Sequence, residues 1–282
     1  MFKKALTNCT KLCIIQMLPH NLFDITCAVS RLICVNGANM PRFFVPPSVL
    51  CSEYVCLDGD TARHIARSLR MAEGDGLTLC DGDGNDFFCH IVGFSKDTVD
   101  VKIDSKTANK AEPPYKATLF QCVAKGEKMD YIVQKSVELG VFAIVPVESE
   151  RTIVRLDRAL AEKKTERWQR ISEEAACQCG RGIVPKIYSP VLFEEAVRLA
   201  SGYKLSLFCY ECEKKSLLKD RLNGMCTDLS FFVGPEGGFS EKEARSAIEN
   251  RLVPVSLGNR ILRTESASGY LLSALSFAWE MR

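Results

Sequence analysis

The sequence predicts an α/β protein in which a parallel sheet follows a smaller, β-barrel-like domain. From Met40 to about residue 105 the chain has short strands separated by turns, whereas after residue 116 short apolar strands alternate with helices. Such an alternation indicates a parallel sheet that is covered on both faces. Between the two patterns, residues 106–115 are polar and contain two adjacent prolines, which is typical of a linker.

The first region contains short strands and one helix. Asp60 or Thr61 can cap the helix. The predicted apolar stripe of this helix is Ala62, Ile65, Ala66 and Leu69. A glycine-rich turn at residues 81–85 is typical of a hairpin. The predicted strands are residues 42–45, 77–80, 86–92 and 99–103.

The second region supplies the parallel sheet. Gly140 ends its first helix, and Ser240 with Glu243 forms a capping box for a later one. The predicted strands are residues 118–123, 141–147, 205–209, 231–233 and 252–256, and the predicted helices include residues 127–139, residues 157–177 and a last helix from about Glu265.

Composition limits the classes of protein that this chain can belong to. The formal net charge is +2, so attraction of a nucleic acid must come from local clusters of Lys and Arg. No apolar run reaches the ~20 residues that span a bilayer, and no compact apolar core precedes a cleavage site, so we expect a cytoplasmic protein. Residues 1–39 have no clean periodicity and are expected to be an N-terminal extension. This extension is either a disordered part of the protein, or it precedes the true translation start at Met40 and is not part of the protein.

Fourteen cysteines and three histidines raise the question of a metal site. Cys177 with Cys179, and Cys209 with Cys212, have the spacings closest to those of metal ligands. A structural zinc site would need all four thiolates to converge, and no histidine lies near either pair. We therefore expect free thiols in a reducing compartment and no metal.

A glycine-rich loop follows the strand at residues 231–233. Its sequence, GPEGGFSEKE at residues 234–243, has three glycines, which let the backbone approach a ligand closely. The loop lies at the carboxyl end of a parallel strand, where open α/β sheets bind ligands. The alternative is a simple strand-to-helix turn. No Gly-Lys-Ser/Thr follows, which disfavours a nucleoside triphosphate loop.

A second loop, SLGNRILRTESA at residues 256–267, also follows a strand. Leu257, Ile261 and Leu262 are apolar side chains that could form a wall for an adenine. The alternative is an ordinary connection in which Thr264 is the N-cap of the last helix.

Together the two loops resemble the ribosomal RNA small subunit methyltransferase E family, which makes 3-methyluridine in 16S RNA. The resemblance covers nearly all of residues 40–282, although Cys177 and Cys179 replace the usual glutamate and serine of one motif. The other matching segments are Pro41-Arg42-x-Phe44, His64 through Leu69-Arg70-Met71 with Gly74-Asp75, Lys125-Gly126-Glu127-Lys128-Met129, Glu138-Leu139-Gly140-Val141, Ser149-Glu150-Arg151 and Ala175-Ala176-x-Gln178-x-Gly180-Arg181.

The resemblance implies a PUA-like RNA-binding β-barrel at residues 40–108 and a SPOUT methyltransferase domain with a trefoil knot at residues 116–282. It also implies a homodimer, S-adenosylmethionine as cofactor, and 16S rRNA in the small ribosomal subunit as substrate. Two alternatives stay open: a SPOUT enzyme that acts on another RNA, and a non-catalytic RNA-binding ribosome assembly factor. By match to the family, the residues that bind the cofactor are Cys209, Gly234, Pro235, Glu236, Gly237, Gly238, Leu257, Gly258, Ile261, Leu262 and Thr264.

Roles in RNA binding and catalysis follow from the same resemblance and from residue chemistry. Arg263 is expected to stabilise a uridine anion, and Glu236, Glu265 or water to accept the N3 proton. Guanidinium groups suit phosphate, and three of the candidates lie on one flank of the first helix, where the alternative is a solvated helix face. The residues expected to contact RNA are Arg42, Arg63, Arg67, Arg70 and Arg181.

Overall fold

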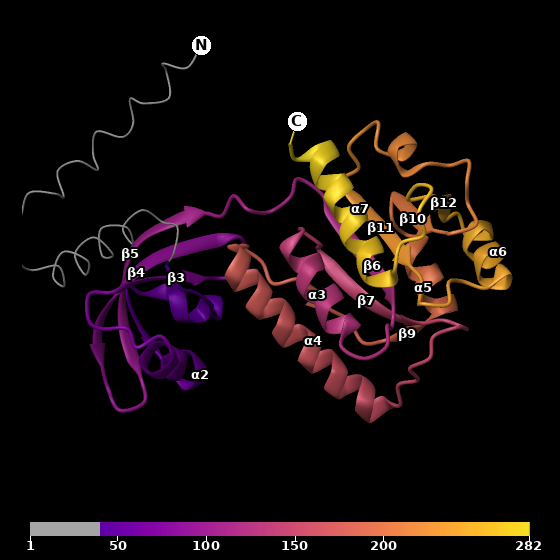
Figure 1. Ribbon diagram of the computed structural model, residues 1–282. Helices are drawn as coiled ribbons and strands as arrows, with labels where there is room; N and C mark the ends of the chain where they lie inside the picture. Colours follow the sequence, from indigo (N-terminus) through magenta and orange to yellow (C-terminus); the bar gives the residue numbers. More distant parts are fainter. Residues whose placement is uncertain (1–39, 282) are drawn as a thin grey trace, which may run out of the picture. The chain divides into compact units, whose positions relative to one another are not determined.

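The computed structural model describes residues 40–281, and the predicted N-terminal extension lies outside the described residues (Figure 1). The first part is a five-stranded sheet in the order β1-β3-β4-β5-β2. The β1–β3 pair is parallel and the other pairs are antiparallel. The strands are β1 (Arg42–Phe44), β2 (Tyr54–Leu57), β3 (Gly76–Cys80), β4 (Asn85–Phe94) and β5 (Val99–Ala108).

The helix of this first part differs from its prediction. It is an α-helical turn, α2 (Gly59–Arg63), followed by a π-helical turn (His64–Ser68). Ala62 and Ile65 are buried as expected, but Ala66 and Leu69 are exposed, so the predicted stripe is wrong at these two positions. A π turn holds more residues than an α turn, which rotates the later side chains away from the core.

Two strands of the first sheet differ from what the sequence predicts. Strand β2 was not predicted; it buries Val55 and Leu57 but leaves Tyr54 exposed, and it lies at the edge of the sheet. Strand β5 continues to Ala108, into the predicted linker, because residues 105–108 pair with β4. Their side chains are exposed and polar, so the sequence alone resembles a linker.

The second part is a sheet of parallel strands in the order β12-β10-β11-β6-β7-β8, with β9 also paired to β7. Its strands are β6 (Lys116–Cys122), β7 (Ala143–Glu148), β8 (Lys186–Ile187), β9 (Val191–Leu192), β10 (Leu205–Cys209), β11 (Asp228–Val233) and β12 (Val253–Val255). Its helices are α3 (Lys128–Glu138), α4 (Arg158–Cys179), α5 (Phe193–Ala200), α6 (Glu241–Glu249) and α7 (Thr264–Trp279).

Helices cover both faces of this sheet, as the sequence predicted (Figure 1). Leu119 and Phe231 point to the face covered by α3, α4 and α7. Their neighbours Phe120 and Phe232 point to the face covered by α5 and α6, and their rings stack with centroids 4.6 Å apart. Because successive strand residues alternate between faces, a strand buried on both sides needs a continuous apolar run.

Of the predicted caps, that of α6 is observed, whereas those of α2 and α7 are not. Helix α2 has Asp58 at its N-cap position instead of Asp60 or Thr61, without a side-chain cap hydrogen bond. The side chain of Asp157 accepts a hydrogen bond from the Leu160 N–H at 2.8 Å, and the capping box of Ser240 and Glu243 is confirmed. The prediction of Thr264 as an N-cap is wrong. Helix α7 has Arg263 at that position, and the Thr264 hydroxyl makes a different contact, described below.

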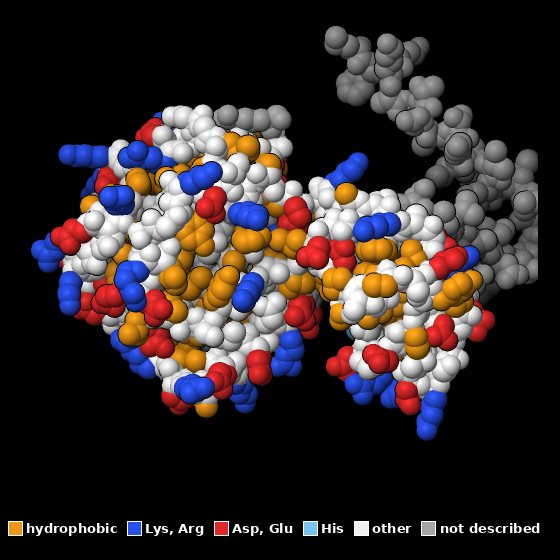
Figure 2. Space-filling model, turned by 180° about the vertical axis from the view of Figure 1, so that it is seen from behind, with side chains coloured by type: hydrophobic (Ala, Val, Ile, Leu, Met, Phe, Trp, Pro, Cys, Tyr) orange, Lys and Arg blue, Asp and Glu red, His pale blue; other side chains and the backbone are white. Residues whose placement is uncertain are grey.

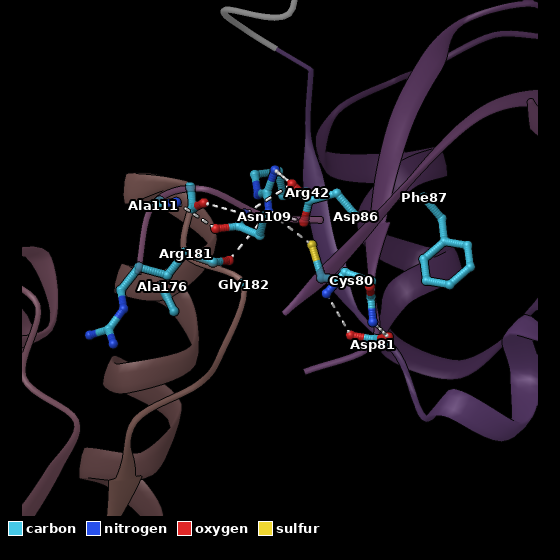
Figure 3. Close-up of polar contacts among 12 residues, drawn as sticks. Arg42, Cys80, Asp81, Asp86, Phe87, Asn109, Ala111, Ala176, Arg181 and Gly182 are labelled. Carbon is cyan, nitrogen blue, oxygen red and sulfur yellow. Dashed lines mark hydrogen bonds and ion pairs between the residues drawn. The ribbon is translucent and has the colours of Figure 1, made fainter. Parts of the chain in front are cut away.

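Polar groups join the first sheet to the end of α4 (Figure 3). The Arg42 guanidinium donates to Asp86 at 2.7 and 3.1 Å and to the Arg181 carbonyl at 3.2 Å. The amide of Asn109 donates to Asp86 at 2.9 Å and to the Gly180 carbonyl at 3.0 Å. Asp86 thus accepts hydrogen bonds from Arg42 and Asn109, and each of these also donates to a backbone carbonyl just after α4. Within residues 40–281, no helix is long and apolar enough to cross a membrane.

Candidate functional site

The carboxyl ends of four neighbouring strands meet at one edge of the parallel sheet. Strands β12, β10, β11 and β6 are adjacent and all point the same way. The loops that follow them, among them the two glycine-containing loops singled out in the sequence, therefore lie side by side. One direct contact is the Tyr210 N–H, which donates to the Val255 carbonyl at 3.1 Å.

A buried chain of hydrogen bonds ties the two loops together. Gln121, near the end of β6, donates from Nε2 to the Thr264 hydroxyl at 2.9 Å. That hydroxyl donates to the Gly234 carbonyl at 2.7 Å. Gln121 is fully buried, and its Oε1 has no hydrogen-bond partner among the described residues. A buried acceptor without a partner is costly, so this oxygen marks a place where a ligand donor would be favourable.

Sequence reasoning missed Gln121. The available signal was a single amide in the otherwise apolar end of a predicted strand, residues 118–123. A polar residue in such a run must find partners on other elements, and the sequence does not say which.

The glycine-rich loop is closely packed against the loop after β10. Gly238 has φ +67°, and a Cβ there would lie 1.9 Å from Oε1 of Glu211. A larger residue would displace this exposed, flexible carboxylate, and the positive φ would strain its backbone. The Gly237 carbonyl accepts from Nη1 of Arg151 at 2.9 Å. These contacts hold the loop from two sides.

The second loop is anchored by two leucines. Leu257 and Leu262 are partly buried and pack against the core that α7 covers. Ile261, in contrast, is 88% exposed. Gly258 turns the chain between the anchors with φ +111°. The loop therefore offers one apolar side chain outside the core while both its ends are held.

A lysine lies between the two candidate carboxylates. Lys128 Nζ is 3.1 Å from Glu236 and 3.9 Å from Glu265. Burial of Glu236 favours its neutral form, but hydrogen bonds from its own backbone N–H, from Lys128 and from the Lys125 N–H outweigh this, so its pKa is lowered. A lower pKa makes Glu236 a weaker base. The hydrogen bonds suit it to organising the loop rather than to accepting a proton.

Glu265 differs from Glu236 in its hydrogen bonding. Its Oε2 is buried and has no hydrogen-bond partner among the described residues. Its Oε1 is 4.0 Å from Nη1 of Arg263, whose side chain is 83% exposed. At the start of α7, the exposed Arg263 therefore lies near Oε1, and the oxygen without a hydrogen bond, Oε2, lies 3.9 Å from Lys128 Nζ.

The five arginines expected to bind RNA divide into two groups. Arg63, Arg67 and Arg70 are exposed, and Arg63 pairs with Asp60 of the same helix. On the face shown in Figure 2, basic and acidic side chains are interspersed, with hydrophobic ones between them. This agrees with the small net charge. Contact of these three exposed arginines with RNA stays a prediction.

Contact of Arg42 and Arg181 with RNA stays a prediction, and the structure places both side chains in contacts inside the protein. Arg181 is 2% exposed and donates to Glu112 and to the carbonyls of Val137 and Val141. Its side chain points away from Asp86 (Figure 3). Arg42 is engaged by Asp86 and by the Arg181 carbonyl. These bonds occupy the Arg181 guanidinium and both Nη groups of Arg42, whereas Arg42 Nε is buried without a hydrogen-bond partner among the described residues.

The cysteine pairs do not form a metal site in the part of the chain that the structure describes. No group of three or more His, Cys, Asp or Glu there is arranged to hold a metal ion. Cys177, Cys179, Cys209 and Cys212 are free thiols. Burial raises the pKa of Cys209 to about 12, so its side chain is a neutral thiol beside the loops.

Comparison with known proteins agrees with this arrangement. Residues 111–276 match the RNA methyltransferase domain family, and residues 57–104 match the RNA methyltransferase PUA domain family. The ribosomal RNA small subunit methyltransferase E of Bacillus subtilis is 34% identical over 80% of this chain and 90% of its own length. The chain belongs to the ribosomal RNA small subunit methyltransferase E family. The protein of the same name from Synechocystis is 30% identical over 83% of this chain and 77% of its own length.

A solved structure gives the same result. The crystal structure of a ribosomal RNA small subunit methyltransferase E from Neisseria gonorrhoeae, bound to S-adenosyl methionine, is 35% identical. It matches with a TM-score of 0.77 over 86% of this chain and 98% of its own. The predicted fold class, a PUA-like domain before a SPOUT-type parallel sheet, is therefore confirmed, whereas the trefoil knot and the domain boundaries stay predictions.

Proposed function

We propose that this chain uses S-adenosylmethionine to methylate N3 of a uridine in 16S rRNA of the small ribosomal subunit, as a cytoplasmic homodimer. The observation that carries the proposal is the buried link from Gln121 through Thr264 to Gly234. It joins both sequence motifs of the family into one site. The relative from Neisseria gonorrhoeae, bound to S-adenosyl methionine, supports the choice of cofactor.

The residues at this edge of the sheet fit such a cofactor. Ile261 offers apolar surface for an adenine beside the anchored leucines, and Gln121 Oε1 offers a buried acceptor. The Gly237 carbonyl accepts from Arg151, which helps to hold the loop backbone. When bound, S-adenosylmethionine supplies an activated methyl group. The residues that would hold it are Cys209, Gly234, Pro235, Glu236, Gly237, Gly238, Leu257, Gly258, Ile261, Leu262 and Thr264.

Two residues at the start of α7 would act on the uridine. Its N3 carries a proton that must leave, and the base becomes an anion as it does so. Arg263 has an exposed guanidinium that can stabilise this anion. Glu265 has an oxygen without a hydrogen bond and is the better proton acceptor, because hydrogen bonds already hold Glu236 in its charged form. Positioning by the two loops would supply much of the remaining rate acceleration.

The test is mass spectrometry of 16S rRNA nucleosides after incubation of the protein with S-adenosylmethionine and 30S subunits that lack the modification. We expect new 3-methyluridine. Cofactor binding without any product would overturn the substrate and favour another RNA. Absence of both would favour the non-catalytic RNA-binding factor.

A single substitution tests the hydrogen-bonded link from Gln121 through Thr264 to Gly234. Thr264→Val keeps the size of the side chain but removes the hydroxyl that links Gln121 to Gly234. We expect cofactor binding, measured by calorimetry, to weaken about tenfold, the loss of roughly one good hydrogen bond. Ser266→Ala, on an exposed position of the same helix, is the control. Equal affinities of Thr264→Val and the control would show that the link does not form the site.

A further inference from the structure

Helix α4 carries a basic face that neither the sequence motifs nor the cofactor site uses. The helical repeat places Lys163, Lys164, Arg167 and Arg170 on one side of it. They line a groove of about 470 Å³ together with Leu160, Ile171 and Glu174. Three other glutamates of the helix, at positions 162, 166 and 173, do not line this groove. The groove is therefore basic although the whole helix has nearly balanced charge.

The groove continues toward the cofactor loops. A second cavity, of about 320 Å³, shares Lys164 and Arg167 with the first. It extends to Val123, Ala124 and Gly126, in the loop that follows β6. The same loop carries the Lys125 N–H, which donates to Glu236 at 3.1 Å. A strand lying along α4 would thus be led to the edge of the sheet where the candidate catalytic residues are.

Most of the cations in the groove are not neutralised. Arg167 is held by Asp130, at 2.6 Å, and Asp130 also accepts from the indole of Trp168 at 3.0 Å. Among the described residues, Lys163, Lys164 and Arg170 form no such ion pair. From residue 163 to residue 170 the helix rises roughly 10 Å. That length allows contact with more than one phosphate of a strand.

We propose that this groove binds the phosphodiester backbone of the substrate RNA and guides it to the cofactor loops. The inference rests on the proposed function. Lysines offer point charges and Arg170 a planar fork, both suited to phosphate, while Leu160, 38% exposed, offers apolar surface to a sugar or base. A second copy of this chain is the poorer occupant, because a two-fold contact would bring the same basic groups together.

The test compares two double variants that each remove two positive charges. Lys163→Ala with Arg170→Ala changes the groove and leaves the Arg167–Asp130 pair intact. Arg158→Ala with Lys242→Ala removes two exposed cations that do not line it, and is the matched control. Binding to purified 30S subunits is measured at several salt concentrations, and methylation at several 30S concentrations.

For the groove variant we expect about tenfold weaker binding near physiological salt, and a slope of log affinity against log salt that is smaller by about 1 to 2. KM for 30S should rise while kcat and cofactor affinity stay unchanged. A salt slope equal to that of the wild type, or the same loss in the control, would overturn the proposal. Failure of the wild-type chain to make 3-methyluridine would instead count against the proposed function. That outcome is distinct from a failure of the groove proposal.

Discussion

Arg42 and Arg181 lie where the end of α4 meets the first sheet, whereas Arg63, Arg67 and Arg70 lie exposed beside α2. All five are arginines near family motifs, and all five were expected to contact RNA. The first two have carboxylates and carbonyls around them and spend their donors inside the protein. For the other three, the described residues provide one ion-pair partner, Asp60, which pairs with Arg63. An arginine is available to phosphate only where the fold leaves its donors without partners.

The largest expected effect is a loss of stability when the buried Arg181 is replaced. Arg181→Ala would remove the donor to Glu112 Oε2 and to the carbonyls of Val137 and Val141, so the Val141 carbonyl and one oxygen of Glu112 would lose the arginine bond. Glu112 Oε1 would keep the N–H groups of residues 182 and 183. We expect a loss of about 3 to 4 kcal/mol in the free energy of unfolding, measured with urea. Arg158→Ala, at the start of α4 with a 94% exposed side chain, should change it by less than about 0.5 kcal/mol. Equal effects would mean that burial does not distinguish the arginines.

The next effect is on catalysis, at an exposed arginine. Arg263→Ala removes the cation proposed to stabilise the uridine anion, so kcat should fall about 100-fold or more. Cofactor affinity by calorimetry and the urea midpoint should not change, because the side chain is 83% exposed. Arg260→Ala, an exposed neighbour in the same loop, is the control. Full activity of Arg263→Ala would remove this residue from the mechanism.

A smaller effect is expected for the exposed group beside α2. Replacing Arg63, Arg67 and Arg70 together with Ala should weaken binding to 30S subunits about tenfold near physiological salt. Thermal stability should stay within about 0.5 kcal/mol of the wild type, since these are surface positions. Binding and stability are measured on the same preparations. Unchanged binding at every salt concentration would identify these arginines as a solvated helix face.

The smallest expected effect concerns a carboxylate, that of Glu236, and its contribution to stability. The pKa of Glu236 is lowered in the folded chain, so its charge stabilises the fold above the unfolded pKa, near 4.3, and this contribution is lost as pH falls through the folded pKa. Glu236→Gln should therefore cost less than about 1 kcal/mol at pH 7, with a difference from wild type that shrinks toward pH 3. Urea unfolding at both pH values measures it. Glu166→Gln, at an exposed position of α4, is the control.

Local patterns determined much of the fold in advance. Alternating apolar strands and helices indicated a parallel sheet, and the strand at Leu205–Cys209 was predicted to the residue. The capping box of Ser240 and Glu243 was also readable, because its partners are three residues apart. The two glycine-containing loops were readable as well, and their resemblance to a family was confirmed, whereas the cofactor residues that it implies stay a prediction. Each of these signals depends on neighbours in the chain.

Only the tertiary structure decided which distant polar groups meet. Gln121 bonds to Thr264, 143 positions away, and Arg42 bonds to the Arg181 carbonyl, 139 positions away. These pairs depend on the order of strands in the sheet and on the end of α4, which periodicity does not encode. The sequence therefore determined which loops carry the chemistry. The fold decided which side chains hold those loops, and which arginines have exposed guanidinium groups.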